Sequence, residues 1–324
     1  MSCPAAALNQ SKMYNFGNKE AFLQSVESGT ARKLQVIFNN TSRTEALLGK
    51  DLYDFNEEEI SSMFLELGMK DYGYIRAALY FIGLYMRWAR QMGFSKGCEP
   101  EEICLKNIDI SETLKMSCAQ NPQELVEKLR EVYPFDERCF TPLQPTAPIV
   151  FLLSWMGLSA SEIWELENEA VNMEQGSITA GGETKPIPKL FLPYIKAYLT
   201  TTEFHNERGI AFRLADCGYV IRRAKFLRDP SLDTRVCKYY PTDCANNFSR
   251  LYYHATGKRV EYTSASTILA GKLYTLYQTE QEKGSLTEQD FIRVWKMVQN
   301  KDIAWKVEDK RLQYEMYKRA FSLN

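Results

Sequence analysis

Residues 151–163, with the sequence FLLSWMGLSASEI, combine two strong local signals within this chain of 324 residues. The apolar first part continues a run that begins at residue 147, and it predicts a helix that is buried on every side. Gly157 follows this run. Ser159 and Glu162 then form the pattern of a capping box, in which each side chain accepts a hydrogen bond from the other residue's backbone N–H. We therefore expect a second helix to begin at Ser159 and to run towards Asn168.

Helical periodicity extends from this segment in both directions. Apolar residues recur at spacings of three and four in residues 56–68 and 71–92. Residues 177–188 break the pattern, and Gly181-Gly182 between Ile178 and Ile187 predicts a short β-hairpin. Further helices are expected from Asn121-Pro122 onward and at residues 190–199, 218–226, 243–256, 265–278, 286–300 and 310–321. The predicted fold class is therefore mainly α, with a short hairpin or small sheet.

The length of the chain and one polar stretch predict two domains. A chain of 324 residues is about twice the usual domain size. A polar stretch that contains Gly97 and Pro100 runs from residue 93 to about residue 112. We place the boundary there, with a small helical domain over residues 1–110 and a larger, mostly helical domain over residues 111–324.

The composition excludes several classes of protein. A hydrophobic fraction of 45%, a charged fraction of 25% and a net charge of −1 exclude a disordered polyelectrolyte and a globally basic nucleic-acid coat. No secretory signal is visible, and the apolar run of residues 147–160 is shorter than the about 20 residues of a membrane span, so a cytoplasmic protein is expected. Eight cysteines without a CxxC pair and only two histidines argue against a zinc site. No metal or other cofactor is predicted.

The positive charge of the chain is concentrated locally. Eleven Lys and Arg residues against four Asp residues give residues 208–259 a net charge of +7. Aromatic residues are interleaved with them, among them Phe226, Tyr239, Tyr240, Tyr252 and Tyr253. This pattern is typical of a phosphate-binding surface, although an ordinary solvated face has the same composition. Arg76, Arg87 and Arg90 fall on one face of the helix at residues 71–92. Two basic faces on two domains favour a clamp around a nucleic-acid duplex.

These features together resemble the tyrosine recombinases, the family of the phage integrases, over about residues 15–320. The segment 151–163 is similar to the apolar helix of the family and its "TGLRxSE" turn. Residues 178–188 are similar to the family's β-hairpin that ends in "vP", and residues 246–263 resemble the helix and loop before its "HxxR" box. The resemblance implies a small core-binding-like (SAM-like) domain and a catalytic-type domain that hold DNA from opposite sides.

The resemblance also implies a chemistry that this chain lacks the residues to perform. Family members cleave DNA by the attack of a tyrosine on a phosphodiester, with two arginines, a lysine and histidines as cations and acids. In this chain, the matching positions are Ser159, Ala180, Ala265 and Ile268, none of which carries a charge. The expected catalytic site is therefore degenerate.

A tyrosine at the nucleophile position is still present. Tyr314 lies nine residues after Trp305, the spacing expected between the last His/Trp position of the family and its tyrosine, and Tyr317 is a neighbouring candidate. We favour core packing of a partly apolar helix for both tyrosines, because the sequence offers them no catalytic partner. An isolated tyrosine has a pKa of about 10 and nothing to stabilise the transition state.

We therefore predict a sequence-specific double-stranded DNA-binding protein that is not an enzyme, namely a phage or prophage transcriptional repressor that regulates lysogeny on an inactivated recombinase fold. One alternative is an active recombinase with relocated catalytic residues and Tyr314 as the nucleophile. A third is a protein-interaction module whose basic faces are only solvated. A homo-oligomer and a regulatory protein partner both stay open. The predicted DNA-binding residues are Arg76, Arg87, Arg90, Lys185, Arg222, Arg223, Lys225, Arg228, Lys258 and Arg259.

Overall fold

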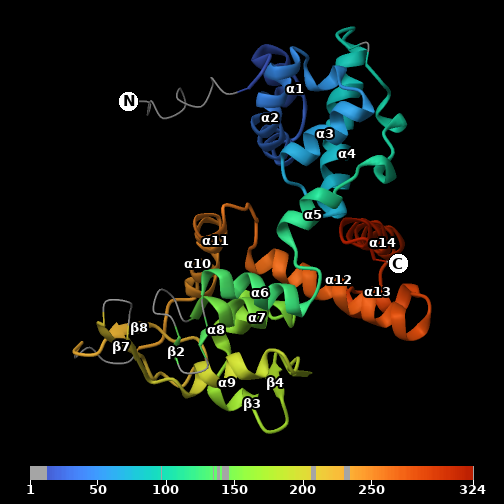
Figure 1. Ribbon diagram of the computed structural model, residues 1–324. Coiled ribbons are helices and arrows are strands. Elements are labelled where there is room, and N and C mark those ends of the chain that lie inside the picture. Colours follow the sequence, from blue (N-terminus) through green and yellow to red (C-terminus); the bar gives the residue numbers. More distant parts are fainter. Residues whose placement is uncertain are drawn as a thin grey trace. The chain divides into compact units, whose positions relative to one another are not determined.

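The computed structural model describes residues 13–95, 97–133, 135–136, 139–140, 146–205, 209–229 and 234–323. The chain forms two compact units (Figure 1). Unit 1 comprises Met1–Thr113 together with Val298–Asn324, and unit 2 comprises Leu114–Met297. The prediction of a mainly helical fold with a small amount of sheet is confirmed. None of the described helices combines the length and apolar character that crossing a membrane requires.

Unit 1 is a helical bundle with an aromatic core. Its helices α3 and α4 match the two predicted from periodicity, and α3 begins with a capping box between Asn56 and Glu59. The rings of Phe22 and Phe38 both contact the ring of Tyr85 in the core of the bundle, with centroids 5.1 Å and 4.8 Å away. The helices are α1 (Phe16–Ser25), α2 (Ser28–Leu48), α3 (Glu57–Glu66), α4 (Tyr72–Gln91) and α14 (Ile303–Ala320), and α5 (Ser111–Ser117) crosses the boundary to unit 2.

A buried ion network lies inside this bundle. The Nζ of Lys19 is 2.6 Å from Oε1 of Glu45 and 3.4 Å from Oδ1 of Asp51, and the side chains of Lys19 and Glu45 have no exposed surface. The rings of Phe38 and Tyr85 surround the same ammonium group at 5.3 Å and 5.8 Å. The network connects α1, α2 and the segment before α3.

The polar stretch before the predicted boundary packs onto α4. It forms two short 3-10 turns, η3 (Pro100–Glu102) and η4 (Leu105–Asn107), which both contact α4. A Cβ atom on Gly83 of α4 would be only 3.2 Å from Cβ of Pro100, so a glycine permits this close approach. The polar composition of this stretch therefore reflects a surface segment of unit 1.

The C-terminal helix α14 belongs to unit 1, although the sequence placed residues 298–324 in the second domain. The buried side chains of Leu312 and Tyr317 face into unit 1. Arg76 of α4 donates to Asp309 from Nε at 2.8 Å and from Nη2 at 2.6 Å. An apolar helix face must be covered, and here α4 covers it. A helix that packs on a distant part of the chain leaves no local sign of where it docks.

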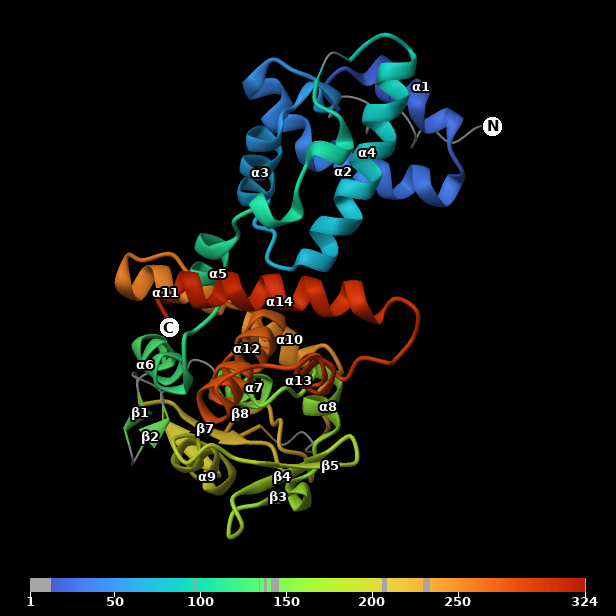
Figure 2. The ribbon, with the colours of Figure 1, turned by 90° about the vertical axis from the view of Figure 1, so that its right-hand side faces the viewer.

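Unit 2 is built around the apolar helix α7 (Thr146–Trp155), in which every residue is buried. The long helix α12 (Ser264–Lys283) packs along it, and Gly271 of α12 lies against the backbone of Trp155. Figure 2 shows the remaining helices around this pair. They are α6 (Pro122–Val132), α8 (Ala160–Glu165), α9 (Leu192–Thr200), α10 (Tyr240–Asn246), α11 (Phe248–Thr256) and α13 (Glu288–Trp295).

Three small antiparallel sheets complete unit 2. The predicted hairpin is confirmed as β4 (Ser177–Ala180) and β5 (Glu183–Pro186), with β3 (Val171–Asn172) as a third strand. The sequence analysis did not predict the sheet of β6 (Glu203–His205), β7 (Ala211–Leu214) and β8 (Ala224–Phe226). The remaining sheet pairs β1 (Phe135–Asp136) with β2 (Cys139–Phe140).

Two predicted helices of unit 2 are corrected. Residues 218–226 do not form a helix: Gly218 has a φ of 77°, and Phe226 pairs with Phe212 across the sheet. The stacked rings of Phe212 and Phe226 stabilise this pairing, which residues 218–226 alone do not reveal. Residues 243–256 form two helices, α10 and α11, because the chain turns at Asn247.

Candidate functional site

Ser159 is the first of the four positions that were predicted to be degenerate, and its side chain serves as a helix cap. The backbone N–H of Ser159 donates to Oε2 of Glu162 at 2.7 Å, and the backbone N–H of Glu162 donates to Oγ of Ser159 at 3.2 Å. The predicted capping box is confirmed. Partial burial raises the pKa of the Glu162 carboxyl, but the Ser159 hydrogen bonds and the charges of Lys185 and Lys296 outweigh this effect and lower the pKa below its usual range.

Another residue of the hairpin, Lys185, lies close to the turn that precedes Ser159. Ala180, the second degenerate position, pairs with Glu183 across the hairpin. Lys185 points inward: its Nζ donates to the carbonyl oxygens of Met156 at 3.2 Å and of Gly157 at 3.4 Å. The Nζ of Lys296 lies 2.7 Å from Oε2 of Glu183. Two cations from other positions therefore stand near Ser159 and Ala180.

The third and fourth degenerate positions lie in the first turns of α12. Ala265 is exposed and Ile268 is partly buried. The helix begins with a capping box between Thr263 and Ser266, so its N-terminal backbone groups are bonded within the turn. All four degenerate positions belong to unit 2 and carry no charge.

Trp305 and Tyr314 lie on α14 and therefore belong to unit 1. The side chain of Tyr314 is 3% exposed, and its ring stacks on that of Tyr317 at 6.4 Å. Trp305 is 42% exposed, and the guanidinium carbon of Arg76 lies 5.9 Å from its ring. The buried surroundings of Tyr314 agree with the core-packing interpretation. Tyr314 belongs to unit 1, whereas the four positions predicted to be degenerate belong to unit 2.

The predicted arginine stripe of α4 is not an open basic face, because each of its arginines has a carboxylate partner. The Asp309 side chain that holds Arg76 is only 2% exposed, so this pair is a fixed part of unit 1. Exposed ion pairs are worth about 0–1 kcal/mol, so a phosphate can replace the surface carboxylates opposite Arg87 and Arg90. The three ion pairs are Arg76–Asp309 at 2.6 Å, Arg87–Glu101 at 2.7 Å and Arg90–Glu99 at 2.5 Å.

Arg222 is not on the surface where the sequence analysis placed it. It is 6% exposed, and its Nη1 donates to the carbonyl oxygen of Thr201 at 3.1 Å. Its Nη2 donates to the carbonyl oxygen of Tyr198, and its guanidinium stacks on the Tyr198 ring at 4.8 Å. The side chain therefore fastens the end of α9 to the segment before β8, and a duplex cannot reach it.

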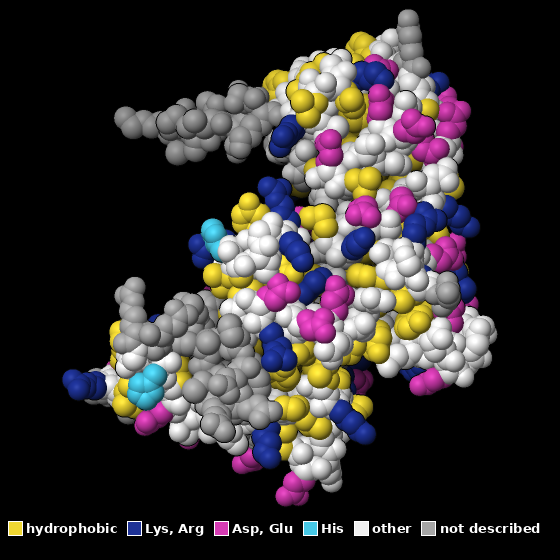
Figure 3. Space-filling model, viewed as in Figure 1, with side chains coloured by type: hydrophobic (Ala, Val, Ile, Leu, Met, Phe, Trp, Pro, Cys, Tyr) yellow, Lys and Arg dark blue, Asp and Glu magenta, His cyan; other side chains and the backbone are white. Residues whose placement is uncertain are grey.

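The other predicted cations of unit 2 form two groups. Arg223, Lys225 and Arg228 lie around β8, next to the exposed ring of Phe226. Lys258 and Arg259 follow α11, and both are exposed. Figure 3 shows Lys and Arg side chains over α11 and at the tip of the sheet that contains β7 and β8, both on the side of unit 2 that faces the viewer.

Four of these cations have no carboxylate at ion-pair distance within the part of the chain that the structure describes. They are Arg223, Arg228, Lys258 and Arg259. Arg208 and Asp233, which the charge count included, lie outside the described residues. The basic segment of unit 2 thus presents cations that no described carboxylate neutralises by an ion pair. In the described ranges, no group of three or more His, Cys, Asp or Glu side chains is arranged to hold a metal ion.

Lys296 was not among the site residues predicted from the sequence. This residue caps α13 in the left-handed conformation, with φ of 52°, and it pairs with a hairpin residue that is distant in the chain. A non-glycine residue with positive φ is uncommon, and the sequence around Lys296 does not indicate that this residue adopts such a conformation.

Comparisons with known proteins place these features in a family context. Residues 13–91 match the family model described as MrpR, N-terminal core-binding domain. The chain is 24% identical over 292 residues to the SPbeta prophage-derived protein YopR of Bacillus subtilis (strain 168), with 84% of each chain covered. It is 36% identical over 110 residues to Tyrosine recombinase XerA of Pyrococcus furiosus, which covers 32% of this chain and 35% of that protein.

Two solved structures also align along most of the chain. The Tn1549 transposon integrase in complex with a circular intermediate DNA has a TM-score of 0.37 and 11% identity, with 90% of this chain and 94% of that chain covered. XerA recombinase has a TM-score of 0.33 and 12% identity, with 91% and 98% covered. The match to the core-binding model and the two sequence relatives show that the chain has a tyrosine recombinase-like fold.

Proposed function

We propose that this protein binds a specific double-stranded DNA site without cleaving it and acts as a transcriptional repressor of a prophage. The observation that carries the proposal is a contrast within unit 2. The sequence resemblance matches the family's catalytic positions to Ser159, Ala180, Ala265 and Ile268, which are uncharged, while exposed cations such as Lys258 have no carboxylate partner among the described residues. A protein that holds a site without cutting it acts by occupancy, and repression is the simplest such action.

The loss of cleavage follows from transition-state electrostatics. Removing one group that stabilises a developing oxyanion costs about 10²–10³ in rate, so four uncharged positions leave little catalysis. Tyr314 adds no activated nucleophile, because it is packed in the core of unit 1. The similarity to a prophage-derived protein over 84% of the chain supports a prophage setting in the host cytoplasm.

The proposed contacts with DNA come from cationic side chains that a phosphate group can reach. Arg223, Lys225, Arg228, Lys258 and Arg259 of unit 2 would neutralise phosphates, which releases condensed counterions. Arg87 and Arg90 of α4 would exchange their exposed carboxylate partners for phosphates. Lys185 is directed at backbone carbonyl oxygens, Arg76 is fixed by Asp309 and Arg222 is buried, so these three are removed from the proposed contacts.

The proposal predicts that Lys258→Ala with Arg259→Ala weakens binding by about tenfold at physiological salt and lowers the salt slope by about 2, since each lost phosphate contact changes the slope by about 1. Genomic fragments retained by the full-length protein supply the site, and fluorescence anisotropy measures the affinity across a salt series. The matched control is Lys189→Ala with Lys196→Ala, which removes two exposed lysines of the same unit and leaves binding unchanged. A wild-type protein that shifts no duplex at moderate salt contradicts DNA binding and supports an interaction module.

Lys185 and Lys296 keep one alternative open, because they bring positive charge near two degenerate positions. In that case the protein is an active recombinase with relocated cations and with Tyr314 as the nucleophile. We expect a nicked suicide substrate to give no covalent protein–DNA adduct on a denaturing gel. A covalent adduct that disappears in Tyr314→Phe would overturn the proposed loss of cleavage.

A further inference from the structure

A cavity of about 580 Å³ lies within unit 2, between the β4–β5 hairpin and the helices α7, α12 and α13. This volume is in the range of about 300–1,000 Å³ that is typical of sites for small ligands. Gly271 lets α12 lie directly against the end of α7, which fixes two walls of the cavity. Neither the degenerate positions nor the proposed DNA contacts line it.

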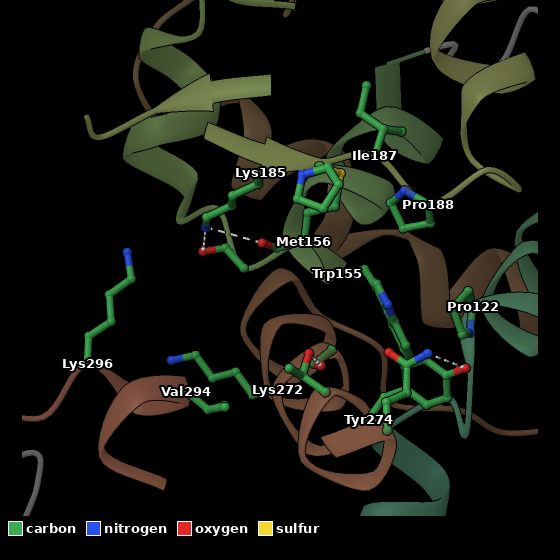
Figure 4. Close-up of a pocket in the computed structure, with 15 residues that line it drawn as sticks. Pro122, Trp155, Met156, Lys185, Ile187, Pro188, Lys272, Tyr274, Val294 and Lys296 are labelled. Carbon is green, nitrogen blue, oxygen red and sulfur yellow. Dashed lines mark hydrogen bonds between the residues drawn. The ribbon is translucent and has the colours of Figure 1, made fainter. Parts of the chain in front are cut away.

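The lining of the cavity is divided by chemistry. In Figure 4, Lys185, Lys272 and Lys296 lie on one side, and Trp155, Pro188 and Tyr274 lie on the other. The three lysines come from the hairpin, from α12 and from the residue after α13, so the fold brings them together from distant parts of the chain. The cavity therefore has a cationic half and an apolar half.

The cationic half is electrostatically unfavourable in the protein alone. Burial and, next, the charge of Lys296 lower the pKa of the Lys185 ammonium below its usual range. The Lys185 ammonium donates to the carbonyl oxygens of Met156 and Gly157, which carry no full charge. Lys296 is held in the uncommon left-handed conformation, and its ammonium group pairs with the carboxylate of Glu183. Strained backbone and crowded like charges persist where function requires them.

We propose that this cavity binds a ligand that carries a carboxylate on an apolar body, with the carboxylate between Lys185 and Lys296 and the apolar body against Trp155 and Tyr274. A carboxylate accepts hydrogen bonds from both ammonium groups and relieves their repulsion. A phosphodiester of DNA would leave the apolar half uncovered. The same chemistry is present in a fatty acid and in the C-terminal residue of a peptide.

Isothermal titration calorimetry on the full-length protein separates these two sources. Octanoate represents the fatty acid, and the tripeptide Ala-Leu-Phe with a free C-terminus represents the peptide. Each has an uncharged counterpart, 1-octanol and the tripeptide amide. We expect at least one carboxylate probe to bind at one site per chain and about tenfold or more tightly than its uncharged counterpart, because a charge-assisted hydrogen bond is lost with the carboxylate.

Substitutions of residues that line the cavity provide a second test of the proposed site. Lys296→Met is expected to weaken the carboxylate probe about tenfold and to leave its uncharged counterpart unaffected. The Lys296 side chain is 58% exposed, so the variant keeps the fold. Val294→Trp fills the cavity with an indole ring. This variant is expected to abolish binding of both the carboxylate probe and its uncharged counterpart. The control is Lys189→Met, an exposed lysine of the segment after β5 that does not line the cavity.

Two results would overturn the proposal. The first is no binding of either carboxylate probe at concentrations up to about 1 mM, where a ligand of this size is expected to bind a matching pocket. The second is binding that Lys296→Met and Val294→Trp leave unchanged. Neither measurement contains DNA, so the outcome is independent of the proposed repressor function.

Discussion

Replacing Lys19 by methionine is expected to lower the free energy of unfolding of unit 1 by about 3–5 kcal/mol, the usual cost of removing one partner of a buried ion pair. Methionine has a similar volume, so the loss arises from charge and not from an empty space. Without the Lys19 ammonium, the carboxylates of Glu45 and Asp51 are left in a core that has no other cation at ion-pair distance among the described residues.

Denaturant unfolding followed by hydrogen exchange of unit 1 amides measures this loss. The control is Lys50→Met, which breaks a pair with Glu59 of the same 2.6 Å length, but with the lysine side chain 45% exposed. An exposed pair is worth about 0–1 kcal/mol, so the control is expected to change stability by no more than that. Equal effects of the two substitutions would show that burial of the Lys19 network does not matter.

The pH dependence of the unfolding free energy provides a second test of the Lys19 network. Burial raises the pKa of Glu45 above its usual range, although the Lys19 charge opposes this effect. A carboxyl with a higher pKa in the folded protein takes up a proton on folding, so stability rises as the pH falls through the shifted pKa. Removing Lys19 removes the opposing charge. The destabilisation by Lys19→Met is therefore expected to be smaller at pH 5 than at pH 8, and a destabilisation that grows towards acid would contradict the assignment.

Replacing Gly271 by alanine is expected to destabilise unit 2 by about 3 kcal/mol or more, because overpacking against rigid backbone is among the most costly core changes. A Cβ atom at this position would overlap the carbonyl oxygen of Trp155, so α12 and α7 would have to separate. The apolar surfaces of both helices form the centre of unit 2. The same displacement would widen the cavity that we propose to bind a carboxylate.

Thermal unfolding monitored by tryptophan fluorescence measures this effect, since Trp155 lies at the substituted contact. The control is Gly29→Ala in α2, where a Cβ atom would meet nothing within 4 Å. Alanine is about 1 kcal/mol more favourable than glycine in a helix, so the control is expected to be neutral or stabilising. A neutral Gly271→Ala would mean that the two helices do not approach as closely as the structure places them.

Local signals in the sequence were sufficient for much of the fold. The capping box at Ser159, the hairpin glycines and the periodicity of α3 and α4 each depend on residues within a few positions of one another. Such features are determined by backbone sterics and short-range hydrogen bonds. They also carried the resemblance to the tyrosine recombinases, and the fold is confirmed.

The candidate sites depended on contacts that the sequence does not encode locally. Nothing around Arg222 distinguishes it from Arg223, yet the first is buried against Tyr198 and the second is exposed. Nothing near Arg76 indicates that Asp309 will neutralise it. A positive charge is therefore readable from sequence, but its availability to a phosphate is not.

The sequence by itself determined a mainly helical chain with a recombinase-like organisation and a basic segment at residues 208–259, and it predicts uncharged residues at the positions that match the family's catalytic groups. The tertiary structure alone decided that α14 packs on unit 1, that Arg222 is internal, and that Lys185, Lys272 and Lys296 line one cavity. The physical reason is the separation along the chain of the residues that interact. Helix caps and turns are decided by neighbours along the chain, whereas burial and ion pairing are decided by which distant segments meet in the core.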